Sequence, residues 1–256
     1  MKSAKKTIIF NLLYTALAVA IIFVAWWVMS AATDSEFVVP SVGATFSAFK
    51  DVFQNPFFWD GLIGTLLRST VGFAVATALF LVAFLLSTAF EPFKRVADII
   101  IGVMRSLPAV AVTLILILAV GGNVTPVVLG VLVIFPIMYS AAIARTATTP
   151  TELKEICVLC GGGKFTMLKS VYLPCLAGGL PESLATAFSY NIKAVIGAEI
   201  LAQTVDSLGM LMKLSQVYFQ PAMLMAFVIT AVVLSVILEV TIRGVLKIAL
   251  RRFADD

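Results

Sequence analysis

The sequence contains no histidine, and only 12% of its residues are charged. Histidine is the side chain that most often supplies acid–base catalysis and metal ligation, so its absence argues against a catalytic or metal centre. The hydrophobic share of 61% excludes an ordinary soluble domain. We therefore expect a membrane protein that is not an enzyme and that uses no cofactor.

Cysteine is scarce as well, with only Cys157, Cys160 and Cys175 in the chain. The first two have redox or zinc spacing, but one such pair without a second pair of ligands is a weak signal. On a helix both thiols would lie on an apolar face, so packing is the favoured interpretation. The neighbouring run Gly161–Lys164 resembles the end of a phosphate-binding loop, yet the required earlier glycine and following Ser or Thr are missing. The chain therefore cannot hydrolyse ATP by this route.

Long apolar runs are abundant, and each is close to the ~20 residues that a helix needs to cross a bilayer. They predict an all-α membrane protein in which residues 1–256 form a single transmembrane domain with a core at about 62–246. The break between the third and fourth runs depends on residues 121–123, because residues 106–144 contain no charge. The six predicted spans are Thr7–Met29, Leu62–Thr88, Ile99–Val120, Val124–Ala144, Leu176–Ala202 and Pro221–Leu238, the last of which continues to about Gly244.

Three lysines precede the first run, which raises the alternative of a cleaved signal peptide. The run has about 23 residues, whereas the apolar part of a signal peptide has about 7–15, so an uncleaved first span is favoured. Between the first two spans, Phe46, Phe49 and Phe53 recur at helical spacing. This pattern predicts a short interfacial helix over Val42–Phe53 on the external side.

Basic residues are unevenly divided between the two sides that these spans define. With a cytoplasmic N-terminus, thirteen lysines and arginines lie on the cytoplasmic side, and only Lys50 and Lys213 lie outside. Positive charge near span ends collects in the cytoplasm, so both termini and residues 145–175 are predicted there. The net charge of +4 follows from this asymmetry. No basic patch with interleaved aromatic residues indicates a nucleic-acid partner.

Residues 145–175 form the one polar insertion among the later spans, and they predict a helical hairpin. Thr149–Glu152 fits a capping box with proline at the first helical position. The first helix would run over Glu152–Cys160 and end at the glycines 161–163, since glycine readily adopts a left-handed conformation. A second helix would run from Lys164 to about Tyr172, before Pro174 restarts the chain. Such a hairpin at the cytoplasmic surface is typical of a docking element.

Ionisable residues inside the spans are the remaining signal, because they are costly at membrane depth and usually face a cavity or a partner. On the fifth span Tyr190 and Asn191 precede Lys193 and Glu199, and we consider these four as candidate residues of a substrate pathway. The alternative for Lys193 is a structural role, in which it snorkels or pairs with Glu199 or Glu182 across a subunit contact.

Two arginines also fall within predicted spans. Arg105 precedes Ser106-Leu107-Pro108 and would lie one to two turns inside the cytoplasmic end of the third span. We expect it to serve a helix kink and an ion pair more than ligand contact. Arg68, near the outer end of the second span, is expected to snorkel to the headgroups.

The hairpin resembles the signature loop of the permease subunits of bacterial ABC importers. In that loop Glu-Ala-Ala, three variable residues and glycine are followed about a dozen residues later by Leu-Pro. Here Glu155-Ile156-Cys157 stands in the first position, Gly161 is the glycine and Leu173-Pro174 closes the pattern. Ile156 and Cys157 depart from the two alanines. Five further strings are similar to the nitrate/sulfonate/taurine-type branch, namely Val39-Pro40-Ser41, Thr65–Arg68, Arg105–Pro108, Ala198-Glu199 and Leu208-Gly209.

The resemblance implies a type I importer permease with six membrane helices and a cytoplasmic coupling helix, in the bacterial plasma membrane. Its partners would be a cytoplasmic ATP-binding subunit, an external solute-binding protein, a second permease copy and membrane lipid. ATP hydrolysis would belong to the partner chain. The residues expected to couple to the ATPase are Glu152, Glu155, Ile156, Gly161, Leu173 and Pro174.

Three alternatives stay open at this stage. The solute could be a small anion such as a sulfonate, taurine or nitrate, or instead a thiamine precursor, riboflavin or a similar heterocycle. A protein of another class, an ATP-independent channel or secondary transporter, would need coupling carboxylates deep in the bundle. Glu182, Glu199 and Glu239 all lie toward span ends, which argues against that class. A membrane enzyme is remote, because no paired carboxylates share a face.

Overall fold

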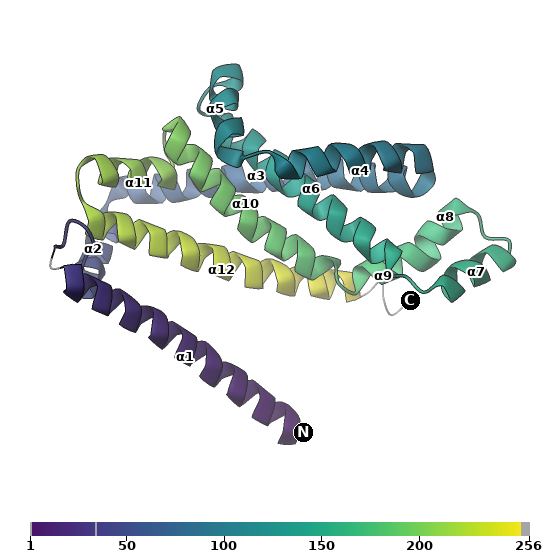
Figure 1. The fold of residues 1–256 in the computed structure, drawn as a ribbon, viewed down its shortest axis with the longest axis horizontal. Helices are drawn as coiled ribbons and strands as arrows, with labels where there is room; N and C mark the ends of the chain where they lie inside the picture. Colours follow the sequence, from purple (N-terminus) through teal and green to yellow (C-terminus); the bar gives the residue numbers. More distant parts are fainter. Residues whose placement is uncertain (1, 34, 252–256) are drawn as a thin grey trace. The chain divides into compact units, whose positions relative to one another are not determined.

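The computed structural model describes residues 2–33 and 35–251, which form helices joined by short turns, without any strand among them (Figure 1). The predicted all-α class is confirmed. Internal contacts divide the chain into two compact units. The first comprises residues 1–58 and 211–229, and the second comprises residues 59–210 and 230–256.

The first unit contains α1 (Lys2–Thr33), α2 (Val42–Gln54), most of α11 (Leu208–Val217) and the start of α12 (Pro221–Arg251). The indole Nε1 of Trp26 donates to the carbonyl oxygen of Pro40 at 3.0 Å, which links α1 to the turn before α2. Ser41 caps α2, because its hydroxyl accepts from the amide of Ala44 at 3.1 Å. The predicted helix over Val42–Phe53 is therefore confirmed, with its end one residue later.

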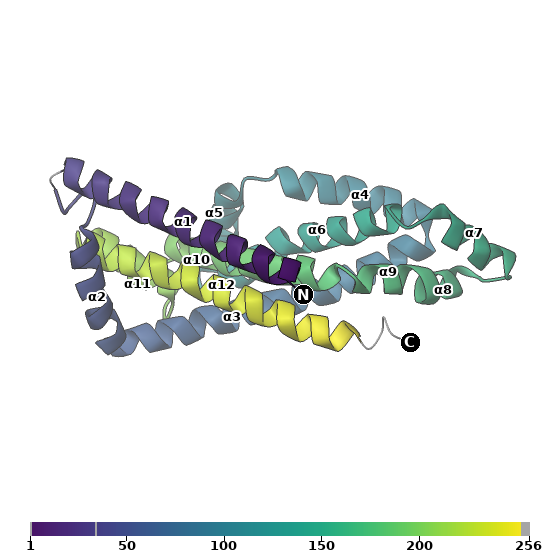
Figure 2. The ribbon, with the colours of Figure 1, turned by 90° about the horizontal axis from the view of Figure 1, so that it is seen from below.

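The second unit is larger and contains the remaining helices. They are α3 (Pro56–Ala89), α4 (Glu91–Ser106), α5 (Ala109–Val120), α6 (Thr125–Ala147), α7 (Thr151–Leu159), α8 (Lys164–Met167), the π-helical turn η1 (Leu168–Tyr172), α9 (Leu173–Ala177), α10 (Leu180–Ala202) and the rest of α12. Both views show α7 and α8 at one extreme end of this unit, beyond the ends of α4 and α6 (Figure 2).

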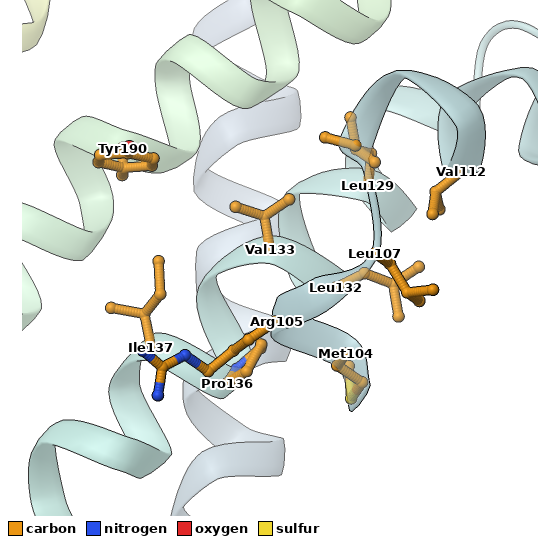
Figure 3. Close-up of a pocket in the computed structure, with 11 residues that line it drawn as sticks. Met104, Arg105, Leu107, Val112, Leu129, Leu132, Val133, Pro136, Ile137 and Tyr190 are labelled. Carbon is orange, nitrogen blue, oxygen red and sulfur yellow. The ribbon is translucent and has the colours of Figure 1, made fainter. Parts of the chain in front are cut away.

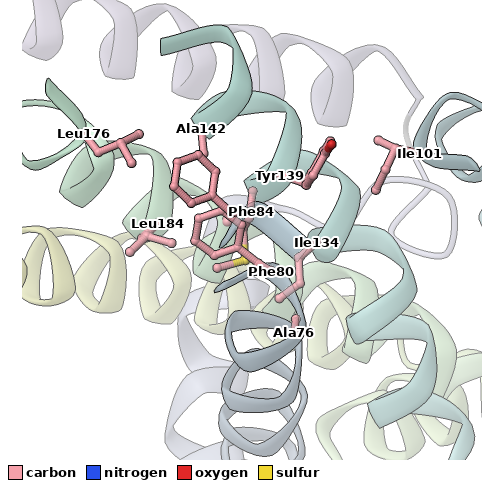
Figure 4. Packing of buried hydrophobic residues seen from close by; sticks show 11 residues of the cluster. Ala76, Phe80, Phe84, Ile101, Ile134, Tyr139, Ala142, Leu176 and Leu184 are labelled. Atoms are coloured by element: carbon pink, nitrogen blue, oxygen red, sulfur yellow. The ribbon is translucent and has the colours of Figure 1, made fainter. Parts of the chain in front are cut away.

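The core of this unit lies where α3, α6 and the start of α10 meet (Figure 4). Phe80 and Phe84 of α3 are almost wholly buried, as are Ile134 and Tyr139 of α6. The buried Tyr139 hydroxyl lies 2.8 Å from the hydroxyl of Ser87, so its polar atom is satisfied inside the apolar cluster.

Close packing between α6 and α10 depends on Gly130. A Cβ at this position would collide with Oδ1 of Asn191 and would lie 3.2 Å from a methyl group of Val195. Asn191 in turn donates from Nδ2 to the carbonyl oxygen of Ser69 on α3, at 2.6 Å. Glycine therefore lets α6 approach α10 closely enough for one buried amide to hold α3 as well.

Four helical segments are long and apolar enough to cross a membrane, namely Leu13–Thr33, Pro56–Ala89, Thr125–Ala147 and Pro221–Ile248. The pair α4 and α5 makes a fifth if it counts as one broken span. The predicted number of six is not confirmed. The remaining candidate for a membrane span is α10. It has 23 residues, as α6 has, but it carries Glu182, Lys193 and Glu199, which lower its hydropathy.

The predicted third span is broken. It begins at Glu91 and not at Ile99, and α5 is bent by 96° from α4. Leu107 is extended, with φ −72° and ψ 129°, because a residue that precedes proline avoids the α region. Pro108 then occupies the cap position before α5, and it has no amide hydrogen to donate. The helix kink expected after Arg105 is therefore confirmed, and it is a complete break between α4 and α5.

Candidate functional site

The hairpin formed by α7 and α8 turns at a left-handed glycine. Gly161 has φ +75°, where a side chain is strained, and the amide of Gly162 donates to the carbonyl oxygen of Cys157 at 2.8 Å. A Cβ on Gly162 would lie 2.6 Å from that same oxygen. The predicted helix stop at the glycines is confirmed. Gly161 is required by its left-handed backbone conformation, and Gly162 is required by the close approach of the Cys157 carbonyl oxygen.

The start of α7 differs from the predicted capping box. Pro150 occupies the cap position, and no side chain caps the helix. The hydroxyl of Thr149 instead donates to the carbonyl oxygen of Arg145 at 3.3 Å, at the end of α6. Threonine therefore closes the preceding helix, because its hydroxyl bonds a carbonyl four residues back more readily than it reaches past proline.

The second half of the hairpin also differs from its prediction. Helical backbone continues from α8 through the π turn into α9, and it ends at Ala177 and not at about Tyr172. In an α-helix the proline ring would clash with the carbonyl four residues earlier. The wider π turn over Leu168–Tyr172 relieves this clash. Leu173 and Pro174, predicted to couple to the ATPase, both lie exposed on this continuous helix.

Two lysines attach the hairpin to the ends of membrane helices. Nζ of Lys154 donates to the carbonyl oxygen of Thr146 near the end of α6 at 3.2 Å. Nζ of Lys164 donates to the carbonyl oxygen of Ala89, the last residue of α3, at 2.6 Å. Carbonyls at helix C-termini lack partners within the helix and carry partial negative charge, so ammonium groups are well placed there. The attachment gives the hairpin a direct mechanical link to α3 and α6.

None of the nine residues of α7 is buried. Glu152, Glu155 and Ile156 are exposed, and Leu159 exposes 85% of its surface. The prediction that both thiols are packed is wrong for Cys160, which is exposed. Cys157 is half-buried. Within residues 2–33 and 35–251, no three potential metal ligands come together. The exposed apolar side chains of α7 and α8 are Leu153, Ile156, Val158, Leu159 and Phe165.

The four pathway candidates on α10 fall into two groups. Tyr190 and Lys193 are exposed, and Nζ of Lys193 lies 5.9 Å from the centroid of the Tyr190 ring. Asn191 and Glu199 are fully buried within the subunit. Burial gives the second group a structural role, so a pathway role for them stays a prediction without support from the geometry.

Glu199 is the centre of a buried polar network. Its carboxylate accepts from Arg68 at 3.2 Å, from the Thr65 hydroxyl at 2.8 Å and from the Gly209 amide at 3.3 Å. Arg68 also donates to the carbonyl oxygens of Val205 and Asp206, at 2.8 and 3.0 Å. The snorkelling predicted for Arg68 is therefore wrong, because its guanidinium finds charge and carbonyls within the protein.

The network joins three strings that the sequence related only by their order, Thr65–Arg68, Ala198-Glu199 and Leu208-Gly209. Its residues hold the loop after α10 against α3. Glu182 pairs separately with Arg243 at 3.6 Å, so within the described chain neither glutamate pairs with Lys193. The signal that could have predicted the network is the presence of one acid and one base at equal depth on two spans.

A pocket of about 350 Å³ lies beside the break between α4 and α5 (Figure 3). Arg105 extends from the end of α4 toward Ile137, and Tyr190 approaches from α10. Pro136 and Tyr190 lie near the midpoints of their helices. The lining residues are Met104, Arg105, Leu107, Ala109, Val112, Leu129, Leu132, Val133, Pro136, Ile137 and Tyr190.

Two expectations for Arg105 need correction. It lies in the last turn of α4, ~21 Å along the axis from Glu91 at 1.5 Å per residue, and not one to two turns from the start. The expected ion pair is not found, since among the described residues no acidic group lies within 4.0 Å of its guanidinium. Arg105 is thus an exposed cation that lines a pocket.

The comparisons with known proteins agree with the resemblance of the hairpin. Residues 81–255 match the family described as binding-protein-dependent transport system inner membrane component. The matched region includes the hairpin, the α4–α5 break and all of α10. No curated protein gives a significant match. Because the match covers well over half of the chain, the protein belongs to this family of inner-membrane components of ABC importers.

Proposed function

We propose that the chain is the permease subunit of an ATP-driven importer for a small anionic solute, of the nitrate/sulfonate/taurine type. Membership of the family implies a solute-binding protein and an ATPase as partners. In this proposal two permease copies form the pathway, both termini lie in the cytoplasm, and the ATPase hydrolyses ATP while the permease does not. Residues 145–175 form the coupling element within a single transmembrane domain.

The observation that carries the proposal is the exposed apolar surface of the hairpin. Leu159 and Phe165 expose 85% and 77% of their surfaces, although the hairpin is rich in charge and follows directly on the membrane helix α6. An apolar surface rimmed by polar residues is typical of a protein contact. Glu152 and Glu155 at this surface offer acceptors for basic residues of the ATPase.

The hydrogen bonds of Lys154 and Lys164 explain how contact with the ATPase would drive transport. Lys154 and Lys164 bond the hairpin to the ends of α6 and α3, two helices of the core. A displacement of the hairpin by the ATPase is then transmitted to these helices as a rigid-body movement. The bundle would alternate between inward- and outward-open states because the ATPase makes different contacts with each.

Recovery of the ATPase with the permease tests this proposal. Gly161→Val places a β-branched residue at φ +75° and should reduce the ATPase that copurifies with a tagged permease about tenfold or more, since such strain costs roughly 1–2 kcal/mol and displaces the whole contact. Glu155→Arg should also reduce the recovered ATPase, because it places a positive charge opposite the basic residues of the ATPase. Both variants should keep their helical circular dichroism.

Gly163→Val is the matched control. Gly163 has φ −79° and open space around its Cβ position, so the substitution should leave ATPase recovery unchanged. Equal recovery with Gly161→Val and Gly163→Val would contradict the coupling role of the turn. Failure of the wild-type permease to copurify any ATPase would favour the ATP-independent channel or carrier.

A further inference from the structure

We propose that the pocket beside the α4–α5 break binds a singly charged organic anion with an apolar body, of which a short alkanesulfonate is the type, and that Arg105 holds its acid group. The inference rests on the proposed transport function and names the class of solute. It differs from a pathway centred on Lys193, because Lys193 is not among the eleven residues that line the pocket.

The charge of the pocket comes from Arg105. A cation at membrane depth is costly unless it meets a counter-ion or water, and no carboxylate of the described chain pairs with this one. Its planar guanidinium offers parallel donors that match two oxygens of a sulfonate or carboxylate. Lys193 adds positive charge nearby, since its Nζ lies 5.9 Å from the centroid of Tyr190.

The backbone at the start of α5 also favours an anion in the pocket. Ala109 and Val112, in the first turn of α5, line the pocket, and no side chain caps this helix. The first amide groups of a helix lack internal acceptors and carry partial positive charge. Interrupted membrane helices commonly direct such ends at anionic groups near the middle of the bilayer.

The rest of the lining selects the body of the solute. Apart from Arg105 and Tyr190, the nine lining residues are aliphatic, methionine or proline. Such a surface gains affinity from buried methylene groups, about fourfold for each. No acidic residue is among the eleven described residues of the lining, so an ammonium group such as that of taurine would meet no carboxylate there. Nitrate offers no apolar body.

Titration calorimetry on the full-length permease assembled with its ATPase, without nucleotide and without the binding protein, tests the proposal. The probes are butanesulfonate, methanesulfonate, taurine and nitrate at constant ionic strength. Butanesulfonate should bind most tightly, and each methylene fewer should weaken binding about fourfold. Arg105→Gln should weaken the binding of butanesulfonate about ten- to a hundredfold, and Arg105→Lys should weaken it less.

Arg95→Gln is the matched control, because Arg95 forms only an exposed pair with Glu91 on the same helix, and it should bind as wild type. If Arg105→Gln does not fold, Ile137→Trp fills the pocket from an exposed position and should abolish the dependence on chain length. Equal binding of all four probes, wild-type affinity in Arg105→Gln or absence of saturable binding would overturn the proposal. These outcomes leave ATPase recovery untouched, so they are distinct from failure of the proposed function.

Discussion

At the scale of single residues, Glu199 organises the part of the molecule that lies around the end of α10. Its buried carboxylate accepts hydrogen bonds from Arg68 and Thr65, more than a hundred residues away, and from the backbone amide of Gly209 at the start of α11. A buried charge is tolerated only when it is paired and its oxygens are bonded, and Glu199 meets both conditions.

Removal of the arginine should therefore be far more harmful than loss of an ion pair at the surface. Arg68→Met leaves the fully buried Glu199 without its counter-ion and should lower the free energy of unfolding by about 3–5 kcal/mol. Arg95→Met, which breaks the exposed pair with Glu91, should change it by about 1 kcal/mol or less. Thermal unfolding in detergent, followed by tryptophan fluorescence, measures both.

The double variant Arg68→Met with Glu199→Leu supplies the control for this prediction. It removes the isolated charge, so it should regain part of the lost stability even though it lacks the ion pair. Similar melting temperatures for Arg68→Met and Arg95→Met would show that the buried network contributes little.

At the scale of elements, glycines set how closely the helices approach. Gly209 at the start of α11 packs against the backbone of α10, where a Cβ would lie 2.7 Å from the amide nitrogen of Ile200 and 2.9 Å from the carbonyl carbon of Glu199. Backbone atoms within a helix cannot move aside as a flexible side chain can, so this contact specifies glycine.

Gly209→Ala should destabilise the protein by about 1–3 kcal/mol through overpacking. Gly197→Ala, on the exposed side of the same α10, meets no atom within 4 Å and should stabilise the helix by about 0.5–1 kcal/mol. Opposite shifts of the melting temperature are the expected result. Shifts of the same sign would contradict the close contact between Gly209 and α10.

At the scale of the whole molecule, the distribution of basic residues predicts which side of the membrane each segment occupies. Cys160 is exposed at the hairpin turn and offers a chemical reporter for this prediction. With Cys157 and Cys175 replaced by serine, a membrane-impermeant maleimide should label Cys160 in inside-out vesicles and not in intact spheroplasts.

An external cysteine provides the reference for accessibility. Ser35→Cys, in a background where the three native cysteines are serine, lies on the predicted external side after α1 and should show the opposite labelling pattern. Labelling of Cys160 in intact spheroplasts would reverse the predicted orientation and would remove the hairpin from the reach of a cytoplasmic ATPase.

Local patterns account for most of what could be predicted. Apolar runs located α1, α3 and α6 to within several residues and predicted the first residue of α12, although α12 extends beyond its predicted end. The length of a membrane helix follows from the bilayer. Gly161 marked the hairpin turn because its conformation is a property of the residue itself. The predictions for Arg68 and for the ion pair of Arg105 were wrong because each depended on neighbours distant in the chain. The predicted cap at Thr149 failed for a local reason, since its hydroxyl bonds the carbonyl oxygen of Arg145 four residues back.

The sequence by itself determined the all-helical membrane class, the polar hairpin and its resemblance to the family, because hydropathy, charge and glycine act locally. Only the tertiary structure decided that Arg68 meets Glu199, that Asn191 is buried against α3 and that Arg105 reaches a pocket beside Tyr190. The physical reason is that the cost of a charge at membrane depth depends on what lies within a few ångströms of it. That neighbourhood is made by helices far apart in the chain.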